Sequence, residues 1–210
     1  MRRTLWGRAS SVNVQKVLWT LDELALDCAR IDAGGRHGRV DTDEFARLNP
    51  NRRVPVLDED GFVLWESHAI MRHLAAGAGG PGSGQPRLRA RADQWMEFTV
   101  TTLQPPFLAL FWQLVRLPEA RRDPGVLRAR RPELDAALGV LDDRLATTTW
   151  LAGDDFTLAD IAAGSLMHRI TDLGLADTGL EALHRWHRAL GARPGYRAHV
   201  ATSYEELRRA

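Results

Sequence analysis

The sequence predicts two domains of different class, a small α/β domain followed by a domain built only of helices. Residues 1–75 alternate short strand-like apolar runs with runs of helical period. Every periodic segment from residue 86 onward is helical. A glycine-rich stretch separates the two parts, and we interpret residues 77–85 as a linker. The predicted domains are therefore 1–76 and 86–210.

The first domain is expected to contain strands and helices in the order β-α-β-α-β-β-α. Strands are predicted at 4–6, 28–31, 54–57 and 62–65, and helices at 12–25, 42–48 and from 67 onward. The crossover through the first helix makes the first two strands parallel. The turn Asp58–Gly61 makes the last two antiparallel. Cys28 falls in a strand that we expect to be buried, where a lone thiol fills core space.

The second domain carries three helical signals. Gln104–Pro106 predicts a kink or a break in its first helix, because proline lacks a backbone N–H. Four leucines recur at helical spacing and predict a buried face: Leu134, Leu138, Leu141 and Leu145. Thr157 and Asp160 form a capping box before a nearly all-apolar run. That helix is expected at the centre of the domain.

Composition and charge exclude several classes of function. The formal net charge is +1 and the charges of both signs are interspersed, so we expect no nucleic-acid binding. The N-terminus lacks the apolar stretch of a signal peptide, and no apolar run is long enough to span a membrane. A single cysteine fits a reducing compartment. The histidines show no metal-ligand spacing. We expect a cytoplasmic protein without a metal and without membrane contact.

Asn49–Ser67 is the segment most informative about function. Its Val54-Pro55 peptide bond is of a kind that is often cis where an extended backbone faces a ligand. Glu66 and Ser67 open the following helix, where free N–H groups and a hydroxyl form an anion site. A small peptide with a free carboxyl group is the predicted ligand. Simple helix capping is the alternative for Glu66 and Ser67.

Three motifs occur here in the order found in the cytosolic glutathione S-transferases: Arg8–Asn13, Val54-Pro55 with Glu66-Ser67, and Gly153–Asp160. The chain resembles that family over nearly its whole length, and its serine-type bacterial, theta-, delta- and beta-like members in particular. The resemblance implies a thioredoxin-like N-terminal domain and an all-α C-terminal domain. It also implies glutathione as co-substrate, a small apolar electrophile, detoxification by substitution or addition, and a homodimer.

The resemblance implies roles for residues of the Asn49–Ser67 segment. Glu66 accepts from the γ-glutamyl ammonium, and Ser67 binds the adjacent carboxylate. Val54 pairs its backbone with the cysteinyl unit, as a strand edge captures a peptide. Arg53 occupies the position at which relatives often have a Gln or Lys directed toward the glycine end of glutathione. Arg52 is the alternative there, and a solvated surface role is open to both arginines.

Activation of the sulfur is expected in the turn before the first helix, because a thiol of pKa about 8.5 needs a donor to be ionised at neutral pH. The resemblance puts Ser11 on the position of the catalytic serine of theta- and delta-like members. Ser10 can be the helix N-cap, a role also open to Ser11. Asn13 is a helper of Ser11 or its rival as donor. This turn has neither Tyr nor Cys, which disfavours the tyrosine classes and mixed-disulfide chemistry.

The second substrate is expected in a pocket between the domains. The stretch 95–112 supplies candidates for its wall, and we expect residues near Thr99 and Thr102 to face it. The leading function is a glutathione transferase. The first alternative is a glutathione-dependent isomerase, dehalogenase or peroxidase on the same scaffold. The second alternative is a non-catalytic binding protein with the same fold.

Overall fold

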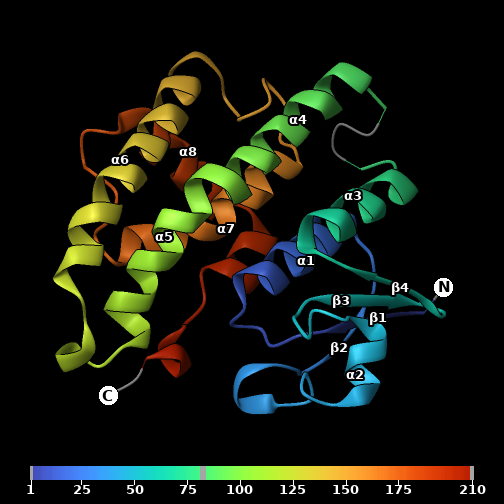
Figure 1. Cartoon of the computed structure of the whole chain (residues 1–210). Coiled ribbons are helices and arrows are strands. Elements are labelled where there is room, and N and C mark those ends of the chain that lie inside the picture. Colours follow the sequence, from blue (N-terminus) through green and yellow to red (C-terminus); the bar gives the residue numbers. More distant parts are fainter. Residues whose placement is uncertain (1, 81–83, 209–210) are drawn as a thin grey trace.

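A computed structural model describes residues 2–80 and 84–208 of the 210-residue chain. A four-stranded sheet with its helices lies at one end, and a larger helical part packs beside it (Figure 1). The first part runs β1 (Arg3–Trp6), α1 (Val12–Glu23), β2 (Ala29–Ile31), η1 (Gly35–His37), α2 (Asp43–Leu48), β3 (Val56–Glu59), β4 (Phe62–Trp65) and α3 (Ser67–Ala78). The predicted order of strands and helices is confirmed, with β3 beginning two residues later than expected.

The sheet has the strand order β2-β1-β3-β4. β1 and β2 are parallel and β3 and β4 are antiparallel, as predicted. Asp60 and Gly61 form the tight turn between β3 and β4, both with positive φ, 50° and 94°. Leu5 of β1 pairs with Leu57 of β3, and both are fully buried under α1 and α3. The α2 helix covers the opposite face through Phe45.

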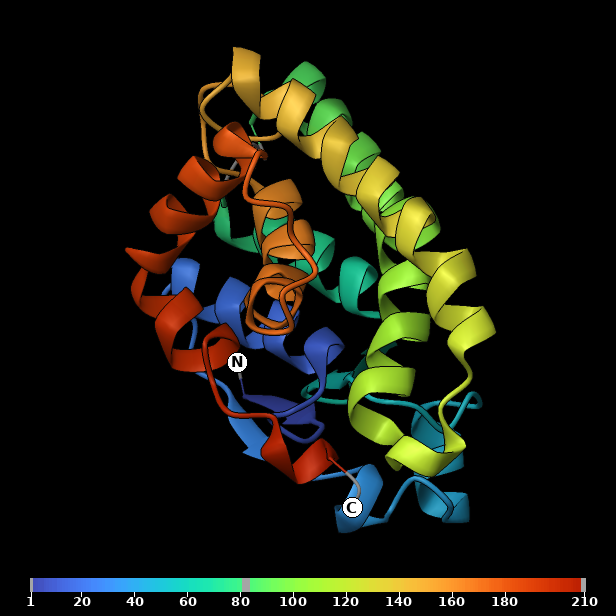
Figure 2. The same cartoon turned by 90° about the vertical axis from the view of Figure 1, so that its left-hand side faces the viewer.

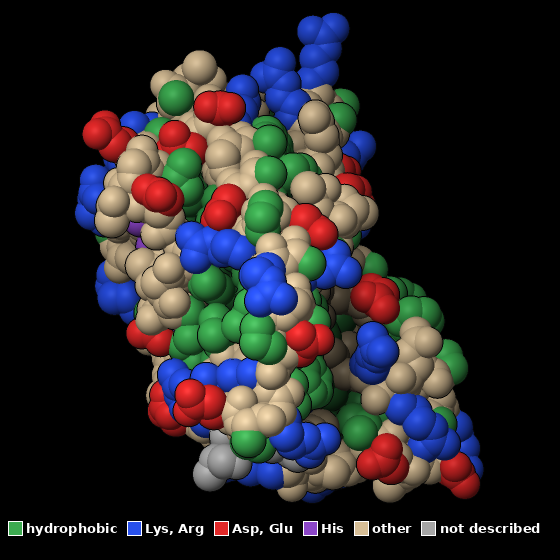
Figure 3. All heavy atoms as spheres, turned by 60° about the vertical axis from the view of Figure 1, so that its left-hand side comes forward, with side chains coloured by type: hydrophobic (Ala, Val, Ile, Leu, Met, Phe, Trp, Pro, Cys, Tyr) green, Lys and Arg blue, Asp and Glu red, His purple; other side chains and the backbone are tan. Residues whose placement is uncertain are grey.

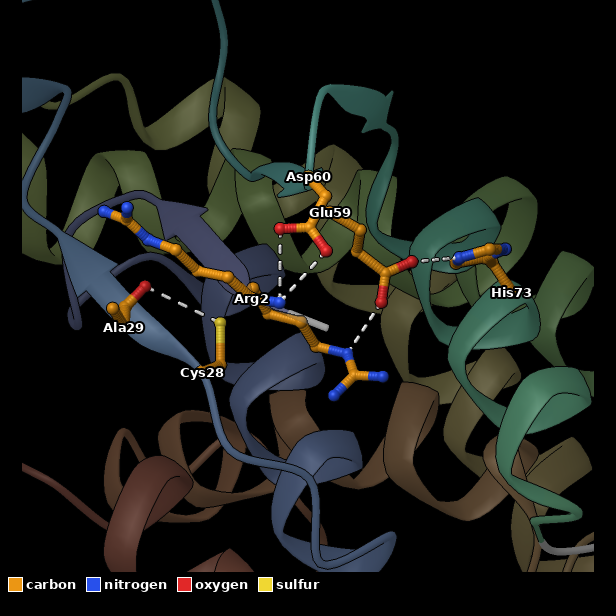
Figure 4. A network of polar contacts seen from close by, with 7 residues as sticks. Arg2, Cys28, Ala29, Glu59, Asp60 and His73 are labelled. Carbon is orange, nitrogen blue, oxygen red and sulfur yellow. Dashed lines mark hydrogen bonds and ion pairs between the residues drawn. The ribbon is translucent and has the colours of Figure 1, made fainter.

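Glu59, at the end of β3, ties the sheet to α3 (Figure 4). Its carboxylate accepts from Arg3 Nε at 2.6 Å and bonds to His73 of α3. Burial raises the pKa of Glu59, but the hydrogen bonds from His73 and Arg3 outweigh it and lower the pKa on balance. A buried carboxylate with two partners fixes the start of the chain against α3.

The prediction that Cys28 falls in a buried strand is wrong, although its side chain packs against the core around Leu5 and Leu57. The β2 strand is the edge of the sheet, and its residues Ala29 and Arg30 are exposed. Cys28 precedes it and is half-buried, with its thiol directed to the Ala29 carbonyl at 3.6 Å (Figure 4). The apolar run that suggested a buried strand covers only one side, because no further strand pairs with β2.

The described helical part contains five α-helices and several short helical turns. Its elements are α4 (Pro86–Phe98), η2 (Thr99–Leu103), α5 (Gln104–Phe111), η3 (Trp112–Arg116), η4 (Glu119–Arg121), α6 (Pro124–Thr147), α7 (Leu158–Asp172), α8 (Glu181–Gly191), η5 (Tyr196–Val200) and η6 (Glu205–Leu207). The kink or break predicted at Gln104–Pro106 corresponds to an interruption of the α-helix directly before the prolines, where α4 ends at Phe98 and α5 begins at Gln104. A wider π-helical turn, η2, lies between the two helices, and the prolines stand in the first turn of α5, where a missing backbone N–H is tolerated.

The α7 helix lies at the centre of the helical part, as predicted. Twelve of its 15 residues are buried. The α7 helix, orange in Figure 2, packs against α1 (blue), α4 (green) and α8 (red). The capping box of Thr157 and Asp160 is present. The four leucines of α6 that were predicted to form a buried face are all fully buried.

The first helix is packed directly against α7. A Cβ at Gly164 of α7 would stand 2.6 Å from Leu190 and 3.2 Å from the Trp19 ring, so any side chain there would clash with Leu190 and crowd the indole. Trp19 of α1 and Met71 of α3 belong to the same apolar core as the helical part. The two parts of the chain therefore share a core, which fixes α1 relative to α5 and α7.

The predicted linker 77–85 lies partly outside the described residues, because 81–83 are not among them. The α3 helix extends to Ala78, two residues into that linker. Residues 77–85 as linker and the domain boundaries at 76 and 86 stay predictions. Among the described residues, no helix is both long and apolar enough to cross a membrane.

Candidate functional site

Ser11 begins the turn of α1 that faces the helical part. It occupies the N-cap position with an extended backbone, φ −82° and ψ 121°, yet its side chain makes no capping hydrogen bond. The hydroxyl is therefore not used by the helix, contrary to the capping alternative. The first N–H groups of a helix also carry partial positive charge. A half-buried hydroxyl and a helix N-terminus together favour a negatively charged atom beside Ser11.

Ser10 differs from Ser11 in burial. Its side chain is 6 % exposed, and its Oγ is buried without a hydrogen-bond partner among the described residues. Its carbonyl oxygen accepts from Arg169 Nη2 of α7 at 2.8 Å. Both serines and Asn13 line one cavity, so the structure brings together all three candidates for contact with the sulfur. Ser10 remains a rival donor on this geometry.

Val54 lies beside the same turn. A Cβ at Gly7 would stand 2.4 Å from Val14 and 3.3 Å from Val54 Cβ, so Gly7 allows the turn and Val54 to meet. The Val54-Pro55 bond is cis, as predicted. Val54 precedes β3, and in the described part of the chain its backbone N–H and C=O form no hydrogen bond. Both groups are open to an extended peptide.

Glu66 and Ser67 form the N-terminus of α3. Glu66 is exposed, has a left-handed backbone with φ 71°, and makes no capping hydrogen bond. A left-handed conformation is unfavourable for a residue with a Cβ and is concentrated at functional sites. Ser67 is 5 % exposed at the first helical position. Glu66 forms no ion pair within the described residues, so its carboxylate can take a ligand cation.

Lys16, the only lysine of the chain, lies on α1 and contacts both α3 and α5 in the protein interior. It is fully buried, donates to Gln104 Oε1 of α5 at 3.0 Å and lies 3.3 Å from His68 Nε2 of α3. Burial lowers the pKa of Lys16 to about 7, although the charge of Glu66 raises it. Burial, together with Lys16, lowers the pKa of His68 to about 2, so His68 is a neutral acceptor. Sequence reasoning missed this group.

The two adjacent arginines after Asn51 have different surroundings. Arg52 donates to the Thr42 carbonyl at 3.0 Å and to Asp43 Oδ1 at 3.3 Å, so it holds the start of α2. Arg53 is exposed and forms no ion pair within the described part of the chain. Of the two, Arg53 is the one that remains available to a ligand carboxylate.

A cavity of about 130 Å³ lies where the turn before α1 meets the helical part. The face in Figure 3 is hollowed where the smaller lobe joins the larger one, and hydrophobic side chains gather there between Lys and Arg side chains. The cavity wall opposite Ser11 comes from Leu108, Phe111 and Trp112. The stretch 95–112 contributes to the wall as expected, through Gln104 among others, but Thr99 itself is fully buried and donates to the Trp95 carbonyl. Thr102 is exposed and does not line this cavity.

Comparison with known proteins identifies the family. The family model of the glutathione S-transferase N-terminal domain matches residues 1–76, and that of the C-terminal domain matches residues 103–194. The chain belongs to the glutathione S-transferase family. This confirms the resemblance and the predicted class of fold, a thioredoxin-like sheet domain followed by a helical domain.

Relatives of this glutathione S-transferase family member match it over most of their length. Glutathione S-transferase GstB of Escherichia coli (strain K12) is 40 % identical over 198 residues, which are 92 % of this chain and 95 % of the relative. The theta-1 enzyme of Rattus norvegicus is 33 % identical over 76 % of the chain and 70 % of its own length. The theta class enzyme from Xanthomonas axonopodis pv. citri, solved with glutathione bound, has a TM-score of 0.90 at 37 % identity, covering 96 % of this chain and 98 % of that one.

Two features of the site in this family member were missed from the sequence. One is Lys16, which its isolation among arginines could have signalled. The other is a group of arginines around the cavity, which come from three distant segments and carry no local signal. Among the described residues, no group of three or more His, Cys, Asp and Glu is arranged to hold a metal ion.

Proposed function

We propose that this chain joins the thiolate of glutathione to a small electrophile. The observation that carries the proposal is the uncapped Ser11 hydroxyl at the N-terminus of α1, in the wall of a cavity. A hydrogen bond to a charged group contributes about 1.5–3 kcal/mol, which corresponds to about one to two pKa units. Starting from a thiol pKa of about 8.5, that donor makes the thiolate abundant at neutral pH. Asn13, in the same wall, is the helper or rival donor.

The γ-glutamyl end of glutathione is assigned to Glu66 and Ser67. Glu66, which forms no ion pair with the residues that the structure describes, accepts from the ammonium group, while Ser67 and the first N–H groups of α3 bind the carboxylate. Val54 pairs its open N–H and C=O with the cysteinyl unit. Arg53 binds the glycine carboxylate, since Arg52 is held by α2. The Xanthomonas relative solved with glutathione supports this ligand for the fold.

In the reaction, the thiol proton leaves to solvent when glutathione binds. The thiolate then attacks the electrophilic carbon from the cavity side. A sulfur–carbon bond forms while the leaving group departs with its electron pair, or the thiolate adds to an activated double bond. We also propose that the chain acts as a homodimer in the cytoplasm and serves detoxification, following the family. Light scattering that gives twice the mass of the chain would support the dimer.

The proposal is tested with glutathione-agarose and an aryl halide. We expect the purified protein to be retained on the column and eluted by free glutathione. With 1-chloro-2,4-dinitrobenzene it should form the conjugate faster than the uncatalysed reaction, and Ser11→Ala should lose most of that rate. Protein that is not retained would refute glutathione binding. Retention without conjugation of any tested halide would favour a different glutathione-dependent reaction.

A further inference from the structure

The peptide unit between Ser10 and Ser11 is held at both of its polar ends. Its N–H, which belongs to Ser11, donates to the Arg8 carbonyl at 3.1 Å. Its carbonyl, which belongs to Ser10, accepts from Arg169 Nη2 of α7 at 2.8 Å. Because a peptide unit is planar, these two bonds fix the direction in which the Ser11 Cα leaves it. The Ser11 hydroxyl then has one side-chain torsion, with three staggered positions, left to adopt.

Arg169 also contacts the first turn of α1. The same Nη2 lies 3.4 Å from Gln15 Oε1, and Gln15 is 1 % exposed. One guanidinium nitrogen therefore joins two points at the start of α1, one before the helix and one inside it. Arg169 lies 159 positions after Ser10 in the chain, so this contact ties the turn of the sheet domain to the central helix of the helical domain.

The guanidinium group of Arg169 is itself firmly placed. It is 4 % exposed and lies over the rings of Phe111 and Tyr204, at 5.3 and 5.2 Å. These two rings pack on each other with their centroids 5.7 Å apart. A planar guanidinium stacks well on aromatic faces. Burial lowers the pKa of Arg169 to about 10, although Tyr204 raises it, so the side chain remains a charged donor at neutral pH.

The apolar surroundings of Arg169 do not account for its charge. Twelve of the 15 residues of α7 are buried, and a buried cation is costly unless it is hydrogen-bonded. Within the described residues, Arg169 forms no ion pair, and the acceptors of its hydrogen bonds are the Ser10 carbonyl and the Gln15 side chain. Hydrogen bonds from a charged donor are about twice as strong as neutral ones. The contact with α1 therefore gives this charge a function that packing does not.

We propose that Arg169 is a positioning residue, which holds the Ser11 hydroxyl in the direction of the glutathione sulfur by fixing the Ser10–Ser11 peptide. This inference rests on the proposed function and deepens it. The helix does not hold the hydroxyl, because Ser11 makes no capping bond. A hydrogen bond weakens steeply when its angle becomes poor, so a displaced turn would donate less well to the thiolate. The helical domain thus takes part in activating the sulfur.

The test measures the pKa of the bound glutathione thiol, by ultraviolet absorbance, in wild type, Arg169→Met, Ser11→Ala and the double variant. No electrophile is present, so a contact of Arg169 with the second substrate does not affect the result. We expect Arg169→Met to raise this pKa by about 0.5 to 1 unit, which lowers the thiolate fraction about three- to tenfold below that pKa. The double variant should have the pKa of Ser11→Ala alone, because Arg169 acts through Ser11. The glutathione Kd should stay within about twofold of the wild-type value.

Two further variants separate position from charge and from stability. Arg169→Lys keeps the charge but is shorter and lacks the planar group, so it should also raise the pKa of the bound thiol, by a smaller amount. It carries the test if Arg169→Met does not fold. Ile170→Ala is the matched control, because it removes buried volume from the same helix outside the cavity. It should leave the pKa of the bound thiol unchanged.

Hydrogen exchange of residues 8–14 gives a second measurement, made on the protein without glutathione. In Arg169→Met these amides should exchange faster than in wild type and in Ile170→Ala, because the turn has lost its contact with α7.

Each other result has a defined meaning. An unchanged thiol pKa in both Arg169 variants overturns the inference while the proposed function stands. Additive shifts in the double variant, or a wild-type pKa in Arg169→Lys, assign the effect to charge and also overturn it. An equal shift in Ile170→Ala assigns it to lost stability, with the same consequence. If wild type does not bind glutathione, the proposed function fails, and hydrogen exchange decides: faster exchange in Arg169→Met keeps Arg169 as the residue that orders the turn, and unchanged exchange refutes it.

Discussion

The N-termini of α1 and α7 lie in the same core but satisfy their polar groups in opposite ways. At α7, the Asp160 carboxylate accepts from the N–H groups of Leu151 and Thr157, the Thr157 hydroxyl and the Trp186 indole. At α1, the N-cap Ser11 makes no side-chain capping bond and the buried Ser10 hydroxyl has no partner among the described residues. The α7 terminus is complete without a ligand, whereas the α1 terminus is not.

This difference separates a structural polar group from a functional one. A buried polar group without a partner is unfavourable and is uncommon in a folded protein. Where such groups collect beside a cavity, the missing partner is best explained as a ligand. The left-handed Glu66 and the open backbone of Val54 extend the same pattern to the rest of the glutathione site.

The largest expected effect on stability is at the N-terminus of α7, the terminus that is complete without a ligand. Asp160→Ala should destabilise the fold by about 3–5 kcal/mol, because it leaves several buried donors without an acceptor. A capping box alone would suggest about 1 kcal/mol. Chemical denaturation measures the loss. Asp160→Asn keeps an acceptor and should lose less, and Asp155→Ala, on the exposed turn before the helix, should stay within about 0.5 kcal/mol. A loss of only 1 kcal/mol for Asp160→Ala would mean that the network adds nothing to the cap.

Glu66→Gln should act on the ligand and not on the fold. It removes the charge that accepts from the γ-glutamyl ammonium, so the glutathione Kd should rise about ten- to a hundredfold. Stability should hardly change, because Glu66 makes no capping bond. Calorimetric titration measures the Kd, with the exposed Glu119→Gln as control. An unaltered Kd in Glu66→Gln would remove this residue from the site.

Lys16 should make stability depend on pH. Its pKa is about 7 in the fold against an ordinary 10.5, so between these values the unfolded chain binds a proton that the folded chain does not. The free energy of unfolding therefore rises with pH across this window, and the destabilisation by the buried charge is greatest below pH 7. Relative to Lys16→Met, the wild type should gain on the order of 2 kcal/mol between about pH 7.5 and 9.5. If the free energy of unfolding changed with pH in the same way for both proteins, Lys16 would remain charged in the folded state, stabilised by Glu66.

Much of the fold follows from local patterns in the sequence. The succession of strands and helices along the chain, the turn at Asp60, the buried leucines of α6 and the capping box each depend on residues close together in the chain, whereas the pairing of β1 with β3 joins distant residues. The exact form of the interruption before Gln104–Pro106 does not follow from such patterns, because a π-helical turn that contacts α6 and α7 has no signal in the local sequence. The exposure of Ala29 and Arg30 likewise depends on β2 having one neighbour instead of two.

The candidate site divides in the same way. Val54, Glu66, Ser67 and Ser11 lie in short motifs, so a resemblance to the family was enough to name them. The arginine group of the cavity assembles Arg8, Arg116 and Arg169 from segments more than 50 residues apart, which no local pattern records. The burial of Lys16 could not be predicted for another reason. The helical period of α1 does not show that α3 and α5 both cover the face on which Lys16 lies.

The pKa of the glutathione thiol bound to wild type and to Ser11→Ala tests the central claim most directly. Ultraviolet absorbance of the thiolate gives this pKa, and Ser10→Ala is the matched control one residue away. We expect Ser11→Ala to raise the pKa of the bound thiol by about one to two units with nearly unchanged glutathione affinity, and Ser10→Ala to leave it in place. A thiolate band unchanged in Ser11→Ala would contradict the account and transfer the role to Asn13, or to Ser10 if its variant shifts the pKa instead.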